Sequence, residues 1–254
     1  MSKILLRMID FKQLRGSQIS KELIGLANAA NDIATASNLL TVAVQAARAQ
    51  TPEKRVLCEG SALHATLSDE SLLNGYQLYC FRMLLGHYSE GAKVLDQLRK
   101  RQATPETRSA EFDYILDHIS KESRAAYDRI TESFAQERHT TKFENLVRGV
   151  RDSVSFHYTG KEYAAAVQAL ASGEVPHSNK AVVAASVPNS RLVFADTVLT
   201  TVICKEIWKV DHEAGKTEEE AVKAAIEWCS NGAIEFLILA QEICFWYIKD
   251  KSGI

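Results

Sequence analysis

The stretch from Thr141 to Tyr158, TKFENLVRGVRDSVSFHY, indicates most clearly which kind of fold this chain adopts. Thr141 and Glu144 have the spacing of a capping box, in which two side chains bind the free backbone N–H groups at the start of a helix. The apolar residues of the stretch are three and four positions apart, so they share one face of that helix. They are Phe143, Leu146, Val147, Val150 and Val154. The stretch therefore predicts an amphipathic helix with one buried side.

Similar start and stop signals on both sides of this stretch predict further helices. The predicted helices cover about 20–49, a short segment from Thr51, 68–101, 104–136, 159–170, 191–210 and 217–249. We expect an all-α fold, an up-and-down helical bundle over residues 1–171, with the C-terminal helices of residues 172–254 packed on the same domain. Runs of β-branched residues at 182–187 and 198–202 leave short strands as the alternative in those two places.

The composition agrees with a helical globular protein. Of the 254 residues 46% are hydrophobic, which is enough for a sizeable core, and 4 prolines and 12 glycines are few for an all-β protein. The formal net charge of −2 provides no general positive field, so binding of nucleic acid would require a local basic patch. Five dispersed cysteines, a short apolar N-terminal segment and the lack of a long apolar run predict a cytoplasmic protein with reduced thiols.

The predicted helix of residues 141–158 ends in a candidate catalytic pair, Arg151 and His157. A guanidinium group can bind a phosphate through two parallel hydrogen bonds, and an imidazole can give or take a proton near neutral pH. Together the two groups suit cleavage of an RNA backbone without a metal ion. Six residues at about 100° each place the pair roughly 120° apart around one helix. A site shared by two copies of this helix, and hence a homodimer, is therefore expected.

The same residues also fit a structural role. A histidine that continues an apolar stripe is often a core residue or a stabilising group at a helix C-terminus, and arginines on a helix flank are usually solvated. Arg82 and His87 form a second pair of this kind, which chance alone can produce; here we predict that His87 lies in the core. The catalytic and the structural interpretation of Arg151 and His157 both remain open.

The pair Arg151-Asp152 followed by Phe156-His157-Tyr158, within a mostly helical chain, resembles the HEPN superfamily. The resemblance covers about residues 20–170 and implies a helical bundle that forms dimers. It also implies a metal-independent endoribonuclease of the kind found in toxin–antitoxin and abortive-infection systems. RNA would then be the substrate, an antitoxin or another protein would be a partner, and no cofactor or metal is expected.

This resemblance assigns a role to each matching residue. Arg151, His157 and Asp152 would be catalytic, with Asp152 orienting its neighbours, and Tyr158 matches a tyrosine of some branches of the superfamily. Arg148, which lies one turn before Arg151, is suited to hold a flanking phosphate, so Arg148 and Tyr158 are candidates for substrate binding. The superfamily also has inactive members, so the alternative is a non-catalytic helical module that binds other proteins.

Other chemistries lack their motifs in this chain. Zinc-ligand spacing, a phosphate-binding loop and a nucleophile elbow are all missing from the sequence. Glu174 and His177 have di-iron spacing, but Pro176 between them argues against a helix there. Asp113, Asp117 and their charged neighbours are expected to form a solvated face. The run from Ile243 to Ile248 is apolar all round, which indicates either complete burial or an interface.

Overall fold

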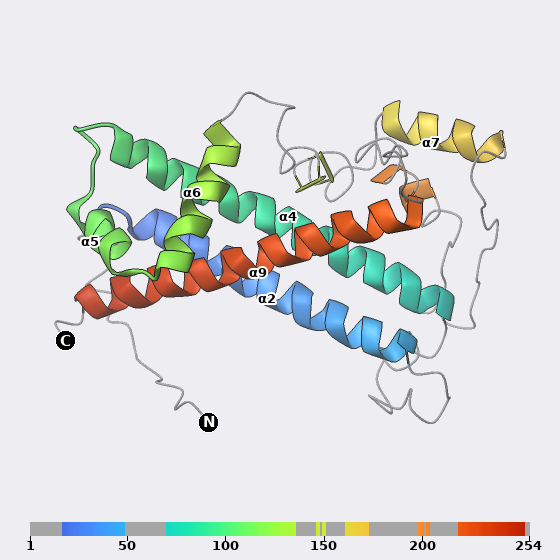
Figure 1. Ribbon diagram of the computed structural model, residues 1–254, viewed down its shortest axis with the longest axis horizontal. Coiled ribbons are helices and arrows are strands. Elements are labelled where there is room, and N and C mark those ends of the chain that lie inside the picture. Colours follow the sequence, from blue (N-terminus) through green and yellow to red (C-terminus); the bar gives the residue numbers. More distant parts are fainter. Residues whose placement is uncertain are drawn as a thin grey trace. The chain divides into compact units, whose positions relative to one another are not determined.

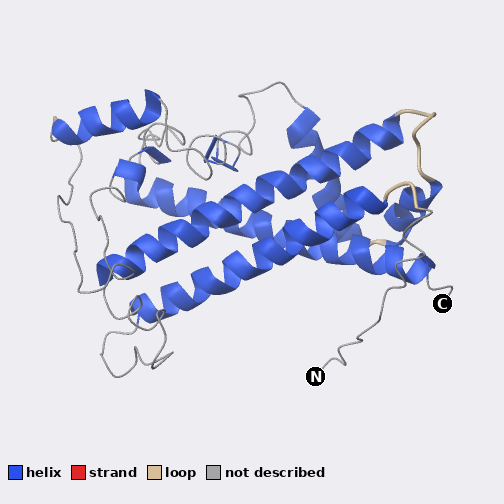
Figure 2. Ribbon diagram, turned by 180° about the vertical axis from the view of Figure 1, so that it is seen from behind, coloured by secondary structure: helices blue, strands red, loops and turns tan. Residues whose placement is uncertain are grey.

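The computed structural model describes residues 17–48, 70–135, 146–147, 149–150, 161–172, 198–200, 202–203 and 218–251. Helices account for nearly all of these residues (Figure 1), and the described part of the chain contains no strand (Figure 2). The bounded helices are α2 (Ser20–Arg48), α4 (Glu70–Ala103), α5 (Ala110–His118), α6 (Lys121–Ala135), α7 (Lys161–Ala171) and α9 (Glu218–Lys251). The predicted all-α fold is confirmed.

The long helices begin and end close to their predicted positions. α2 and α4 start and stop within two residues of the predicted bounds, and α9 extends to Lys251 where the sequence predicted an end at Lys249. The capping boxes at Thr141, Thr159 and Thr217 and the predicted short helix at Thr51 lie outside the described residues. Start and stop signals in the sequence are thus a reliable guide to helices of this length.

One expectation about secondary structure was confirmed in part and one was wrong. Residues 198–200 are helical, as predicted for the helix of about 191–210, so the alternative of a strand is excluded there, whereas residues 182–187 lie outside the described part. The single helix predicted from Thr104 to Gln136 is instead the pair α5 and α6. Ser109 has extended backbone angles and its hydroxyl accepts a hydrogen bond from the N–H of Phe112, so α5 starts there and not at Thr104.

The chain forms two compact units, each built from segments that are distant in the sequence. The first comprises Met1–Asn31, Glu90–Gln136 and Ile234–Ile254, and the second comprises Asp32–Ser89 and Glu137–Ala233. α2, α4 and α9 each contribute one part to each unit. The domain boundary after residue 171 stays a prediction.

In the first unit, α5 and α6 pack beside the C-terminal part of α9 (Figure 1). Phe112 and Tyr127 make an edge-to-face ring contact with centroids 5.9 Å apart, and Phe236 of α9 is fully buried. Gly91 of α4 lies against the ring of Phe236 so closely that a Cβ atom there would overlap it. The absence of a side chain at Gly91 therefore lets α4 and α9 approach each other in this unit.

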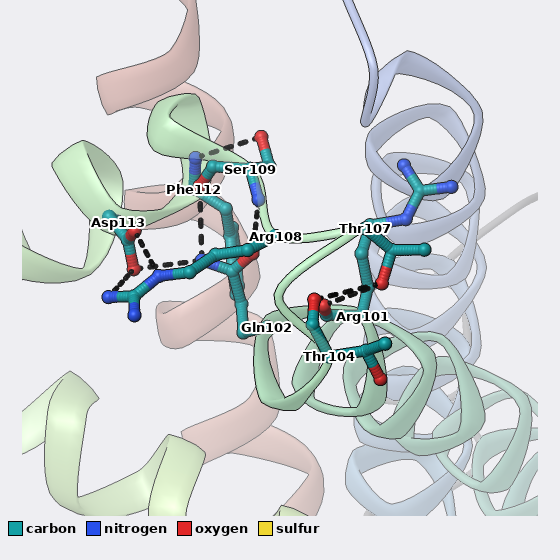
Figure 3. A network of polar contacts seen from close by, with 8 residues as sticks. All are labelled: Arg101, Gln102, Thr104, Thr107, Arg108, Ser109, Phe112 and Asp113. Atoms are coloured by element: carbon teal, nitrogen blue, oxygen red, sulfur yellow. Dashed lines mark hydrogen bonds and ion pairs between the residues drawn. The ribbon is translucent and has the colours of Figure 1, made fainter.

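The turn between α4 and α5 is held by a local polar network (Figure 3). The Gln102 amide receives a hydrogen bond from the backbone N–H of Ser109 at 2.7 Å and donates one to the Asp113 carboxylate at 2.8 Å. Arg108 binds the same carboxylate from the other side, also at 2.8 Å. Asp113 therefore stabilises this turn although its side chain stays 37% exposed. The charged residues Asp117, Lys121 and Glu122 are exposed, as predicted for a solvated face.

Candidate functional site

The five residues predicted to form a site lie outside the part of the chain that the structure describes. They are Arg148, Arg151, Asp152, His157 and Tyr158. The structure therefore neither brings them together nor separates them. What it does describe is the segment directly before the pair, at residues 146–147 and 149–150, which belongs to the second unit.

This preceding segment has the buried side that the sequence predicts. Leu146 is 7% exposed, and Val147 and Val150 are fully buried. These are three of the five residues of the predicted apolar stripe; Phe143 and Val154 lie outside the described residues. Burial of three large apolar side chains provides several kcal/mol of stabilisation, at about 1.5–3 kcal/mol each. The packing of Leu146, Val147 and Val150 therefore holds the chain in place directly before Arg151.

The segment around Leu146 packs against α9. The thiol of Cys229, which is fully buried, lies 4.0 Å from the carbonyl oxygen of Leu146, within the same unit. A thiol is a weak hydrogen-bond donor, so this contact reports close packing more than a strong bond. The residues that precede Arg151 therefore rest against the N-terminal half of α9.

The structure describes the second arginine–histidine pair, Arg82 and His87, so the prediction that His87 lies in the core can be checked. Arg82 is 6% exposed, whereas the His87 side chain is 27% exposed and its Nδ1 lies 3.4 Å from an Asp32 carboxylate oxygen. The prediction that His87 is a core residue is wrong, because Asp32 of α2 provides a polar partner at the surface. Five residues at about 100° each direct the two side chains roughly 140° apart, so one helix does not aim them at a common point.

A further polar and aromatic cluster joins α5 to α9 in the first unit. The His118 ring lies between Tyr114, at a centroid distance of 4.0 Å, and Trp246, at 4.9 Å. Its Nδ1 donates a hydrogen bond to the Tyr114 carbonyl at 2.7 Å, and Lys249 places its ammonium group 4.3 Å from the Trp246 ring centre. This cluster was missed from the sequence, because His118 and Trp246 meet only through tertiary packing.

Two weakly acidic side chains of the same unit, Cys244 and Tyr127, keep their protons near neutral pH. Burial raises the pKa of the Cys244 thiol to about 11 and that of the Tyr127 hydroxyl to about 12. Desolvation disfavours the charged form of both groups. Cys244 therefore lacks the thiolate character that a nucleophilic cysteine needs.

Within the described residues, no group of three or more histidine, cysteine, aspartate or glutamate side chains is arranged to hold a metal ion. None of the described helices has an apolar stretch of the length needed to cross a membrane.

Comparison with known proteins adds no relative to this picture. No protein-family model matches the chain, and no curated protein or solved structure is significantly similar to it.

Proposed function

We propose that this chain is a metal-independent endoribonuclease or RNA-binding protein of the HEPN type, with Arg151 and His157 at its functional site. The observation that supports the proposal is the burial of Leu146, Val147 and Val150. It agrees with the amphipathic helix that the sequence predicts in front of the pair, within a chain whose described part is helical. A firmly packed segment is what a catalytic pair needs in front of it, because small displacements reduce catalysis strongly.

The proposed reaction is attack by a ribose 2′-hydroxyl on the adjacent phosphorus. The O2′–P bond forms and the P–O5′ bond breaks, which leaves a 2′,3′-cyclic phosphate and a free 5′-hydroxyl. One proton leaves the 2′-oxygen and another is delivered to the 5′-oxygen, and His157 acts in one of these transfers. Arg151 stabilises the negative charge that develops on the phosphoryl oxygens, and Asp152 orients its neighbours. Arg148 and Tyr158 hold the RNA beside the reacting bond.

The site would be shared by two subunits, since one helix directs Arg151 and His157 about 120° apart. A homodimer in which two copies of this helix face each other places the arginine of one subunit near the histidine of the other. The resemblance also supports a protein partner such as an antitoxin.

A second candidate function is a non-catalytic helical module that binds proteins. The observation that favours it is the outer face of α9, where Ile234, Ile238 and Phe245 are each about half exposed. Exposed apolar residues on one face of a helix are typical of sites of protein association.

RNA cleavage in the presence of EDTA distinguishes the two functions. We expect the wild-type protein to cleave single-stranded RNA, and we expect His157→Ala to lower the rate by about 10²- to 10⁴-fold, the usual contribution of a general acid or base. His87→Ala is the matched control. His87 also follows an arginine, but we expect its replacement to leave the rate of RNA cleavage unchanged. Equal rates for the wild-type and His157→Ala proteins would rule out the catalytic proposal.

A further inference from the structure

The C-terminal part of α9, which belongs to the first unit, is not completely buried. Phe236, Leu239 and Ile243 are fully buried, whereas Phe245 is 50% exposed. The expectation of complete burial for the run from Ile243 to Ile248 is therefore wrong, and an interface remains as the alternative. Single exposed apolar residues are ordinary on protein surfaces, so the groups around Phe245 decide whether it has a function.

Phe245 is the middle member of a row of three side chains on α9. Gln241 lies one turn before it and Lys249 one turn after it, and residues four apart are neighbours on the surface of a helix. Gln241 and Phe245 are exposed, and Lys249 is partly exposed. This row, here called the α9 row, therefore presents an amide, an aromatic ring and an ammonium group along about 12 Å of helix.

Trp246 holds two members of the α9 row in place. The Phe245 ring makes an edge-to-face contact with the Trp246 ring, with centroids 5.5 Å apart, and the Lys249 ammonium group lies 4.3 Å from the centre of the Trp246 ring. Trp246 itself packs against His118 of α5. The aromatic ring and the ammonium group of the row are therefore close together and positioned before any ligand binds, which reduces the entropy cost of binding.

We propose that the α9 row binds an unpaired nucleobase together with its phosphate, as both occur in single-stranded RNA. The half-exposed ring of Phe245 suits stacking on a flat base, the Gln241 amide can donate to and accept from the base edge, and Lys249 binds the phosphate. These three groups match the three parts of a nucleotide. The inference rests on the proposed function for RNA as the source of the base, although Arg151 and His157 belong to the other unit.

The carboxylates of this part of α9 leave room for an anion at the row. Glu235 already binds Arg129 at 2.6 Å, and Glu242 accepts hydrogen bonds from Ser120 at 2.7 and 2.9 Å. Asp250 follows Lys249 directly in the sequence, and consecutive residues of a helix do not face each other. One ammonium group nevertheless supplies only one phosphate contact, so we expect weak binding of RNA, with a Kd of about 1–100 µM at physiological salt.

Fluorescence anisotropy of a labelled single-stranded RNA of about ten nucleotides tests the proposal. The full-length His157→Ala protein serves as the parent, because it is expected to leave the RNA intact. In this parent, Phe245→Leu should weaken binding about 5- to 100-fold by removing one stacked ring, whereas Phe245→Trp should keep the affinity. Tyr79→Leu is the matched control, because Tyr79 is 49% exposed but lies on α4 in the other unit, and it should bind as the parent does. Circular dichroism verifies that each variant is folded.

The salt dependence of binding tests the phosphate contact. Lys249→Gln should lower the slope of log affinity against log salt by about 0.7, the release of one counterion from a single strand. The proposal is overturned if the parent binds no RNA, if Phe245→Leu binds as tightly as the parent, or if leucine and tryptophan at this position weaken binding equally.

The outcome for catalysis is separate from the outcome for this site. A wild-type protein that binds RNA through Phe245 but does not cleave it in EDTA would contradict the ribonuclease proposal and support the α9 row. A protein that cleaves RNA but binds it equally well after Phe245→Leu would do the opposite.

Discussion

Gly91 shows how one residue without a side chain determines the packing of two helices. A Cβ atom at this position would overlap the ring of Phe236, which is itself fully buried. The sequence does not reveal this requirement, because a glycine inside a helix usually only lowers its stability and Phe236 lies far away along the chain. The same limit applies to His118 and to His87, whose neighbours Trp246 and Asp32 come from other helices.

We expect Gly91→Ala to lower the free energy of unfolding by about 1–3 kcal/mol, the usual cost of inserting atoms into a packed core. Gly25→Ala is the matched control, since a Cβ atom there would lie 3.5 Å from Val94, an ordinary contact. Alanine is the better helix former by about 1 kcal/mol, so the control should be as stable as the wild type or slightly more stable. Urea unfolding measures both. Similar destabilisation of the two variants would contradict the close approach of Gly91 to Phe236.

At the scale of helices, predictions from local sequence succeed where the signal itself is local. The long helices α2, α4 and α9 were predicted within about two residues at their described ends, because the signals that start and stop them lie in the local sequence. The break between α5 and α6 was missed, because it depends on a residue 122 positions away. The Ser120 backbone N–H and hydroxyl donate hydrogen bonds to the Glu242 carboxylate, at 2.7 and 2.9 Å.

Ser120 also caps α6, because its hydroxyl accepts a hydrogen bond from the N–H of Ser123 at 3.1 Å. Replacing Ser120 with alanine removes both the cap and one bond to Glu242, so we expect a loss of about 1–2 kcal/mol in the free energy of unfolding. Ser133→Ala on the same helix is the control, because its hydroxyl only donates to the carbonyl of Arg129 within the helix. That change should alter the stability by less than about 0.5 kcal/mol. Thermal unfolding that gives equal losses for the two variants would show that Ser120 is not a cap.

At the scale of the whole molecule, the sequence predicted the all-α class correctly, whereas the site remains a hypothesis. The buried residues Leu146, Val147 and Val150 agree with the predicted helix in front of Arg151 and His157. The position of the pair itself lies beyond the described residues. The division into two compact units follows only from the tertiary structure and not from local patterns.

The central claim is that an arginine from one subunit and a histidine from the other act on the same phosphodiester. The most direct test mixes the Arg151→Ala and His157→Ala proteins in equal amounts, at a concentration that favours the dimer. RNA cleavage by this mixture is then measured in EDTA. Each variant alone should be inactive. The mixture should recover about a quarter of the wild-type rate, because about half of the dimers are mixed and each of these regains one of two sites. A mixture as inactive as its components, under conditions where subunits exchange, would contradict the shared site.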